Sequence, residues 1–230
     1  MGSKRIIVTG SSRGIGLELV KQLISQDHEV LALSRNTENL QLMSNSRKNL
    51  HPLEVDICDA KDLETVVKFV KERWGVVDIL VHNAGTLLHK PFKETRLEDF
   101  INVYQVNVFA VAELTRQLEQ FLKPGSHVLG ISSMGGIQGS MKFAGLSAYS
   151  SSKGALITLM ELLAEEYKEK GVSFNTLALG AVQTEMLKEA FPDYQAPTTA
   201  AEMGAYIADF SLNGNKLFNG KVLQVSNSTP

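Results

Sequence analysis

The sequence predicts an α/β fold in which a doubly wound, parallel, seven-stranded sheet carries helices on both faces. Short apolar runs alternate along the chain with longer amphipathic segments, which is typical of strands that alternate with helices. A glycine-rich turn, Thr9–Gly16, joins the first apolar run to the first amphipathic segment. Because parallel strands need crossover helices, and such crossovers are right-handed, the helices should cover both faces of the sheet.

Seven short apolar runs are the predicted strands. In chain order they are Arg5–Thr9, Glu29–Ser34, Leu50–Val55, Val76–Val81, Ser126–Ile131, Val172–Leu177 and Lys221–Val225. The predicted helices between them are Gly14–Gln26, Asn36 to about Ser46, Asp59–Trp74, Leu97–Leu122, Ala148–Lys170 and Thr199 to about Phe210. The helix over 97–122 is either one long helix or two abutting helices.

Periodicity and helix-ending residues support these assignments. In the first helix, Ile15, Leu19 and Leu23 share one face with Ile24. Gly75 is expected to close the third helix, and the Pro124-Gly125 pair is expected to stop the fourth.

The segment 184–198 has the weakest periodicity of the chain. It follows the carboxyl end of the sixth strand, and ligands bind at that end in sheets of this type. A flap over a substrate is one interpretation, and a plain surface connection fits equally well.

Composition bounds the class of protein. A length of 230 residues suits one α/β domain over 1–230. The formal net charge of −2 provides no basic field for nucleic acid or anionic lipid. The apolar runs are too short for a signal peptide or a membrane span, so we expect a cytoplasmic protein. Cys58 is the single cysteine and the histidines are scattered, so no metal site is expected.

The glycine-rich turn suits a phosphate-bearing ligand. Its glycines permit a tight turn and a close backbone approach, and they lead into a helix N-terminus that can hold a pyrophosphate. The residues expected to contact the ligand here are Gly10, Ser12, Arg13, Gly14, Ile15 and Gly16.

The end of the second strand bears on the choice of cofactor. NAD sites usually carry an acid there that binds the ribose 2′-hydroxyl, but this chain has Ser34 followed by Arg35. Arg35 could bind a 2′-phosphate, and Arg13 could approach the same phosphate. The pattern favours NADP over NAD, although two solvated surface arginines would also fit.

Tyr149 and Lys153 are four residues apart in a predicted helix and so share one face. A nearby ammonium favours phenolate and should lower the tyrosine pKa from about 10 toward the operating pH. The spacing alone is common, and a packed tyrosine beside a solvated lysine is the ordinary alternative.

These motifs together resemble those of the short-chain dehydrogenase/reductase family over nearly the whole chain. Thr9–Gly16 resembles the family's T-G-x-x-x-G-x-G turn, Asn83-Ala84-Gly85 its N-A-G motif, and Tyr149 with Lys153 its Y-x-x-x-K pair. The resemblance implies a Rossmann-like, NADP(H)-dependent oxidoreductase that interconverts a carbonyl and an alcohol.

The resemblance also implies a catalytic tetrad of Asn107, Ser133, Tyr149 and Lys153. Tyr149 would protonate the developing alkoxide, Lys153 would lower its pKa and bind the nicotinamide ribose, and Ser133 would donate to the carbonyl oxygen. Asn107 would hold a water that connects Lys153 to solvent. Ser132 would be structural.

Further cofactor contacts are implied by the same resemblance. Asp56 and Ile57 would contact the adenine, Thr184 would bind the nicotinamide carboxamide, and Val182 would be a further contact of the cofactor. Ser34, Arg35, Asn83, Ala84, Gly85, Tyr149 and Lys153 complete the expected cofactor set. The implied partners are a small carbonyl or alcohol substrate and a second copy of the chain, in a homodimer or homotetramer built on helices 97–122 and 148–170.

Two departures leave an alternative open. The segment between Ser133 and Tyr149 is longer than is usual in the family, with the extra length expected in Ser140–Leu146. Leu179-Gly180 stands where the family has Pro-Gly. A cofactor-binding sensor with little catalysis is therefore a second hypothesis. His82 in place of the commoner asparagine is expected to be harmless.

Overall fold

The computed structural model describes residues 2–226 and contains the predicted parallel sheet. Its strand order is β3-β2-β1-β4-β5-β6-β9, and every neighbouring pair is parallel. The strands are β1 Arg5–Thr9, β2 Glu29–Ser34, β3 Leu50–Glu54, β4 Val77–His82, β5 Leu122–Ser133, β6 Ser173–Leu179 and β9 Lys221–Val225. The doubly wound fold is thus confirmed.

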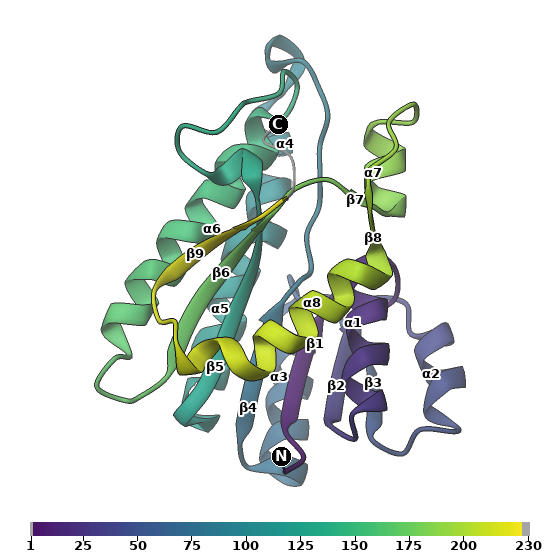
Figure 1. Cartoon of the computed structure of the whole chain (residues 1–230), viewed down its shortest axis with the longest axis vertical. Coiled ribbons are helices and arrows are strands. Elements are labelled where there is room, and N and C mark those ends of the chain that lie inside the picture. The colour runs from purple at the N-terminus through teal and green to yellow at the C-terminus, as the bar shows by residue number, and fades with distance from the viewer. Residues whose placement is uncertain (1, 227–230) are drawn as a thin grey trace.

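Helices cover both faces of this sheet (Figure 1). The α-helices are α1 Gly14–Ser25, α2 Glu38–Ser44, α3 Ala60–Phe69, α4 Leu97–Tyr104, α5 Ala110–Leu118, α6 Ser147–Glu166, α7 Glu185–Ala190 and α8 Ala200–Asn213. Side chains of α1, α2 and α8 pack in one core, and those of α3, α5 and α6 pack in the other.

Successive side chains along each strand point into opposite cores. In β1, Ile6 and Val8 enter the core beneath α1 and α8, whereas Ile7 enters the opposite core. All three side chains are fully buried, because a strand covered on both faces must be apolar on both. The continuous apolar runs of the sequence have this origin.

The helix predicted over 97–122 is interrupted and ends early. A π-helical turn, Gln105–Phe109, separates α4 from α5, and a 3-10 turn, Glu119–Phe121, follows α5. β5 then begins at Leu122, before the Pro124-Gly125 pair that was expected to precede it. The strand passes through this pair because Ser126 Oγ donates to the Val77 carbonyl (2.7 Å) and holds the segment against β4.

The segment 184–198 contains more regular structure than its sequence indicates. β7 Val182–Gln183 and β8 Thr198–Thr199 form a separate two-stranded parallel sheet. Between them lies α7, whose N-cap is Thr184 with Oγ1 accepting from Leu187 N (3.2 Å). Figure 1 shows α7 apart from the main sheet, on the side of α1 and α8.

Membrane-spanning helices and metal-binding clusters are two features that distinguish classes of protein, and both are absent from residues 2–226. None of the described helices has the length and apolarity needed to cross a membrane. The described residues also contain no group of three or more His, Cys, Asp or Glu side chains arranged to hold a metal ion.

Candidate active site

The candidate site lies at the carboxyl ends of the central strands, where the glycine-rich turn meets the segment after β4. A Cβ atom at Gly10, whose φ is +66°, would lie 2.7 Å from Ala84 Cα. A Cβ atom at Gly16 would lie 2.5 Å from Asn83 Nδ2. Only glycine allows the two segments to approach this closely.

Hydrogen bonds join the same two segments. Asn83 Nδ2 donates to the carbonyls of Thr9 and Gly10, both at 3.0 Å. Thr9 Oγ1 accepts from the backbone N–H groups of Asn83 (3.1 Å) and Ala84 (3.0 Å). The Asn-Ala-Gly motif therefore holds the turn in place from the neighbouring strand.

The turn has the chemistry of a dinucleotide site. It leads into α1, whose first-turn N–H groups form an anion-binding end. Within residues 2–226, the N-cap residue Arg13 makes no side-chain cap to these groups, so they remain available to a phosphate. The residues present thus fit a pyrophosphate.

Arg35 and Asp56 lie together at the ends of β2 and β3. Asp56 Oδ1 accepts from Cys58 N (2.9 Å), and the charge of Arg35 acts on the Cys58 thiol. Burial, followed by the Asp56 charge, raises the pKa of this thiol to about 11, so it stays protonated. Arg35 is exposed and Ser34 is buried at the tip of β2.

Arg13, which is expected to approach the same phosphate as Arg35, has a carboxylate partner in this structure. Its Nη1 lies 3.1 Å from Glu189 Oε1 of α7. The shared role of the two arginines stays a prediction.

Lys153 lies beneath Tyr149 on α6. Its side chain is buried, and Nζ donates to the Ile131 carbonyl (2.8 Å) and lies 5.9 Å from the centre of the Tyr149 ring. Burial lowers the pKa of this ammonium to about 8. Ser132 Oγ donates to the Lys153 carbonyl (2.9 Å), which is a structural contact between β5 and α6.

Ser133 and Tyr149 meet across the long connecting segment. The Ser133 hydroxyl faces the Tyr149 phenol and lowers its pKa. The larger effect is burial, which raises this pKa. The predicted lowering by Lys153 is therefore wrong for this structure, since Lys153 is directed to the Ile131 carbonyl and burial dominates.

Asn107 is fully buried on the π-helical turn. Its Oδ1 accepts from Thr86 N (2.9 Å), and its Nδ2 donates to the Thr86 carbonyl (3.0 Å) and to Ser152 Oγ (2.9 Å). A Cβ atom at Gly85 would lie 3.3 Å from Lys153 Nζ and 3.4 Å from Asn107 Oδ1. The glycine lets these two side chains and the segment after β4 come together.

Ser152 was not among the site residues predicted from the sequence. Its Oγ donates to the Tyr149 carbonyl (2.7 Å) while accepting from Asn107, so it connects two members of the predicted tetrad. The only signal in the sequence is a serine next to Lys153 in a predicted helix. The structure shows that this serine is fully buried.

Comparisons with known proteins decide the family. Residues 4–195 match the family described as short chain dehydrogenase. This chain belongs to the short-chain dehydrogenase family. Members of this family are oxidoreductases, and the chain is an enzyme of that class.

Individual relatives agree with this assignment. The chain is 30% identical over 215 residues to an NADPH-dependent pterin aldehyde reductase of Arabidopsis thaliana, covering 89% of this chain and 87% of that protein. It is 27% identical over 194 residues to the 3-oxoacyl-acyl-carrier-protein reductase of Escherichia coli, covering 84% and 79%. A short-chain dehydrogenase from Burkholderia cenocepacia, crystallised with NADP, superimposes with a TM-score of 0.87 at 25% identity, covering 98% and 97%.

The long connecting segment of this short-chain dehydrogenase is folded on itself. Ser140 Oγ donates to the Met134 carbonyl (2.6 Å), and Lys142 Nζ donates to the carbonyls of Gly135 (2.8 Å) and Ile137 (2.6 Å). Leu179, the other departure, pairs with Ser133 of β5 and closes β6. Both departures are thus accommodated without separating Ser133 from Tyr149.

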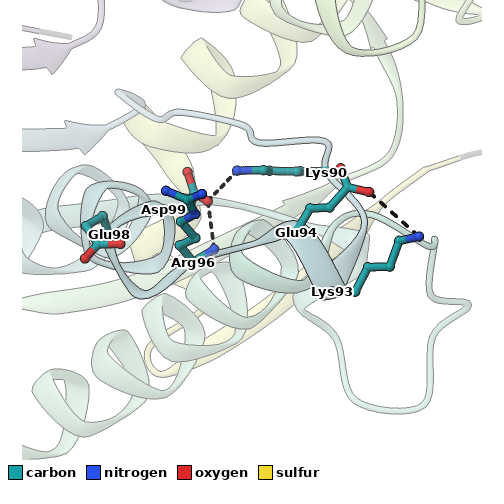
Figure 2. Close-up of a pocket in the computed structure, with 6 residues that line it drawn as sticks. All are labelled: Lys90, Lys93, Glu94, Arg96, Glu98 and Asp99. Carbon is teal, nitrogen blue, oxygen red and sulfur yellow. Dashed lines mark hydrogen bonds and ion pairs between the residues drawn. The ribbon is translucent and has the colours of Figure 1, made fainter.

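A charged surface hollow lies outside the predicted tetrad (Figure 2). It is lined by Lys90, Lys93, Glu94, Arg96, Glu98 and Asp99. The Lys90–Asp99 pair (2.7 Å) and the Lys93–Glu94 pair (3.9 Å) neutralise charges within it. Asp99 also accepts from Arg96 N (2.8 Å), which caps α4, so these groups serve the start of that helix.

Proposed function

We propose that this chain is an NADP(H)-dependent oxidoreductase that interconverts a ketone or aldehyde with the corresponding alcohol. The observation that carries the proposal is that Lys153 Nζ lies 5.9 Å from the centre of the Tyr149 ring. This pair is joined through Gly85 and Ala84 to the glycine-rich turn that leads into the anion-binding end of α1. A bound nicotinamide cofactor would supply or accept the hydride.

The side chains of the chain would manage the proton and the oxygen. Tyr149, whose raised pKa keeps it protonated, would give its hydroxyl proton to the substrate oxygen in the reductive direction. Ser133 would hold that oxygen through its own hydroxyl. With a pKa of about 8, Lys153 can be cationic or neutral near neutral pH and so can return a proton toward Tyr149.

Asn107 would position the helix that carries Tyr149 and Lys153 rather than contact the substrate. Its amide is bound by the Thr86 backbone and by Ser152, so it holds the segment after β4 against α6. The proposed water between Asn107 and Lys153 would lie beside Gly85, which is near both side chains.

The preference for NADP(H) is supported by Arg35 at the tip of β2, where an acid is absent from the sequence. Two similar proteins support it as well, one named as NADPH-dependent and one crystallised with NADP. Asp56, Ile57, Val182 and Thr184 are the further proposed contacts of the cofactor, and the segment 184–198 is the proposed substrate flap.

The substrate would be a small carbonyl compound or alcohol. Pterin aldehydes and 3-oxoacyl thioesters, named for two relatives, are the first classes to test. We also propose a homodimer or homotetramer in the cytoplasm. Ile101, Phe109 and Leu162 are 49%, 51% and 64% exposed on the two helical segments assigned to the interface.

The test is an assay of purified protein with NADPH and NADH against ketones, 3-oxoacyl thioesters and pterin aldehydes. We expect turnover with NADPH that Tyr149→Phe abolishes. Tight NADPH binding with no turnover above that of Tyr149→Phe on any compound would instead support the sensor hypothesis. Light scattering and cell fractionation test the assembly and the location.

A further inference from the structure

Helix α7 places two carboxylates against the cofactor end of the site. Glu185 and Glu189 are four residues apart and therefore share one face of this helix. Glu189 Oε1 lies 3.1 Å from Arg13 Nη1. A Cβ atom at Gly14 would lie 3.4 Å from Glu185 Oε2. One carboxylate of this short helix is thus paired with Arg13, and the other lies close to Gly14, the next residue of the glycine-rich turn.

The groups that these carboxylates meet are phosphate-binding groups. Gly14 begins α1, and the N-terminus of a helix attracts anions through its free N–H groups and its dipole. Arg13 carries a guanidinium, which binds phosphate and carboxylate oxygens in the same geometry. A glutamate carboxylate can therefore bind to the same groups as a phosphate.

Contacts at both ends hold α7 in this position. At its start, Thr184 caps the helix and approaches Gly14, where an added Cβ would lie 3.4 Å from Thr184 Cγ2. At its end, the Phe191 and His89 rings are 4.6 Å apart, and His89 Nδ1 lies 3.2 Å from the Ala190 carbonyl. The carboxylates are thus carried by an anchored helix.

We propose that Glu185 and Glu189 stand in for the phosphates of the cofactor and thereby set its affinity and its selectivity. The proposal rests on the proposed function of the site. Glu189 competes with the 2′-phosphate for Arg13, and Glu185 competes with the pyrophosphate at the start of α1. Binding requires α7 to withdraw both carboxylates from the turn.

The two residues should differ in their effect on selectivity. Only NADP(H) carries a 2′-phosphate, so neutralising Glu189 favours NADPH over NADH. Both cofactors carry the pyrophosphate, so neutralising Glu185 strengthens both equally. Glutamine keeps the size and much of the hydrogen bonding of glutamate while removing its charge.

The experiment measures the dissociation constants of NADPH and NADH by calorimetry for five proteins: wild type, Glu185→Gln, Glu189→Gln, the double variant and Glu165→Gln. We expect Glu189→Gln to tighten NADPH about two- to fivefold, the range of an exposed ion pair, with a smaller change for NADH. Glu185→Gln should tighten both cofactors alike. Glu165 of α6 is the matched control, because it is an exposed carboxylate that also pairs with a cation, Lys168.

The outcomes separate this inference from the proposed function. Cofactor binding by wild type that no Gln variant strengthens would overturn the inference and leave the proposed function standing. Failure of all five proteins to bind either cofactor would overturn both. Binding by the double variant alone would support the inference in its strongest form.

Proteolysis provides a readout independent of affinity. Tyr194, which is 48% exposed, follows α7 and is a cleavage point for chymotrypsin. Because the two carboxylates help to hold α7, the double variant should be cut faster than wild type without cofactor. NADPH should accelerate cleavage of wild type as it displaces the carboxylates. Equal rates in all these cases would count against the inference.

Discussion

Asn107 donates a 2.9 Å hydrogen bond to Ser152, although the two residues lie on different helical segments of the chain. Ser152 precedes Lys153 and in turn donates to the Tyr149 carbonyl. The contact therefore joins the π-helical turn to the helix that carries Tyr149 and Lys153. Both side chains are fully buried, so solvent water cannot replace either partner, and losing one would leave a buried polar group unsatisfied.

Replacing Ser152 should reveal the energy of this contact. In Ser152→Ala, one N–H of the buried Asn107 amide loses its acceptor, and we expect the free energy of unfolding to fall by about 1–3 kcal/mol. Urea denaturation measures the change. Ser151→Ala is the control, because Ser151 is an exposed neighbour whose Oγ donates to the Ala148 carbonyl (3.2 Å). Equal losses in the two variants would contradict the assignment.

Replacing Tyr149 should remove catalysis but leave the cofactor bound. Tyr149→Phe keeps the ring near Lys153 and deletes the hydroxyl that would act as the acid. We expect turnover to fall by about 10²–10⁴-fold, the usual contribution of a positioned acid. Steady-state rates and NADPH titration measure the two effects. Turnover retained within a few-fold would remove Tyr149 from the mechanism.

Arg35 should discriminate between the cofactors. In Arg35→Ala, NADPH loses a charge-assisted contact of about 1.5–3 kcal/mol, whereas NADH loses none. The ratio of the two dissociation constants should therefore change by at least about tenfold. Arg47→Ala, at another exposed arginine, serves as the control. A similar weakening of both cofactors would show that Arg35 does not bind the 2′-phosphate.

His82 should make the stability of the protein sensitive to acid. Burial lowers the pKa of its imidazole from 6.5 to about 3, and Nε2 lies 2.8 Å from Thr115 Oγ1. A folded-state pKa below the unfolded value means that the full contribution is present above about pH 6.5. It is lost as pH falls toward the folded value, because the unfolded state takes up the proton first.

The variant His82→Asn isolates this effect. Relative to wild type, its free energy of unfolding should increase by about 1.4 kcal/mol for each unit by which the pH falls between 6 and 4. Denaturation curves at pH 8 measure the pH-independent difference in stability between the two proteins. This difference is subtracted from the values at lower pH. A difference that does not change with pH would show that His82 titrates alike in both states.

Much of the fold could be predicted because it follows from local patterns. The buried run Arg5–Thr9 and the turn after it require no distant information, since a sheet covered on both faces needs apolar residues on both. The helix over 97–122 was harder to predict. Its apolar pattern continues through Gln105–Phe109, and the π-helical turn there is not a property of that pattern.

The segment 184–198 shows the limit of periodicity. Helix α7 is too short for an amphipathic pattern to emerge, and β7 and β8 have two residues each. Such elements persist through tertiary contacts, here the pairing of Val182 with Thr198 and the anchoring of Phe191 on His89.

The sequence by itself determined the order of strands and helices, the glycine-rich turn and the residue types of the predicted tetrad, because these are set by spacing along the chain. The tertiary structure alone decided the partners. Arg13 pairs with Glu189, Asn107 with Ser152, and Lys153 with the Ile131 carbonyl. Burial also raised the pKa of Tyr149, against the expectation from its neighbour in sequence. Such contacts and pKa values depend on groups that folding brings together from distant positions and removes from water.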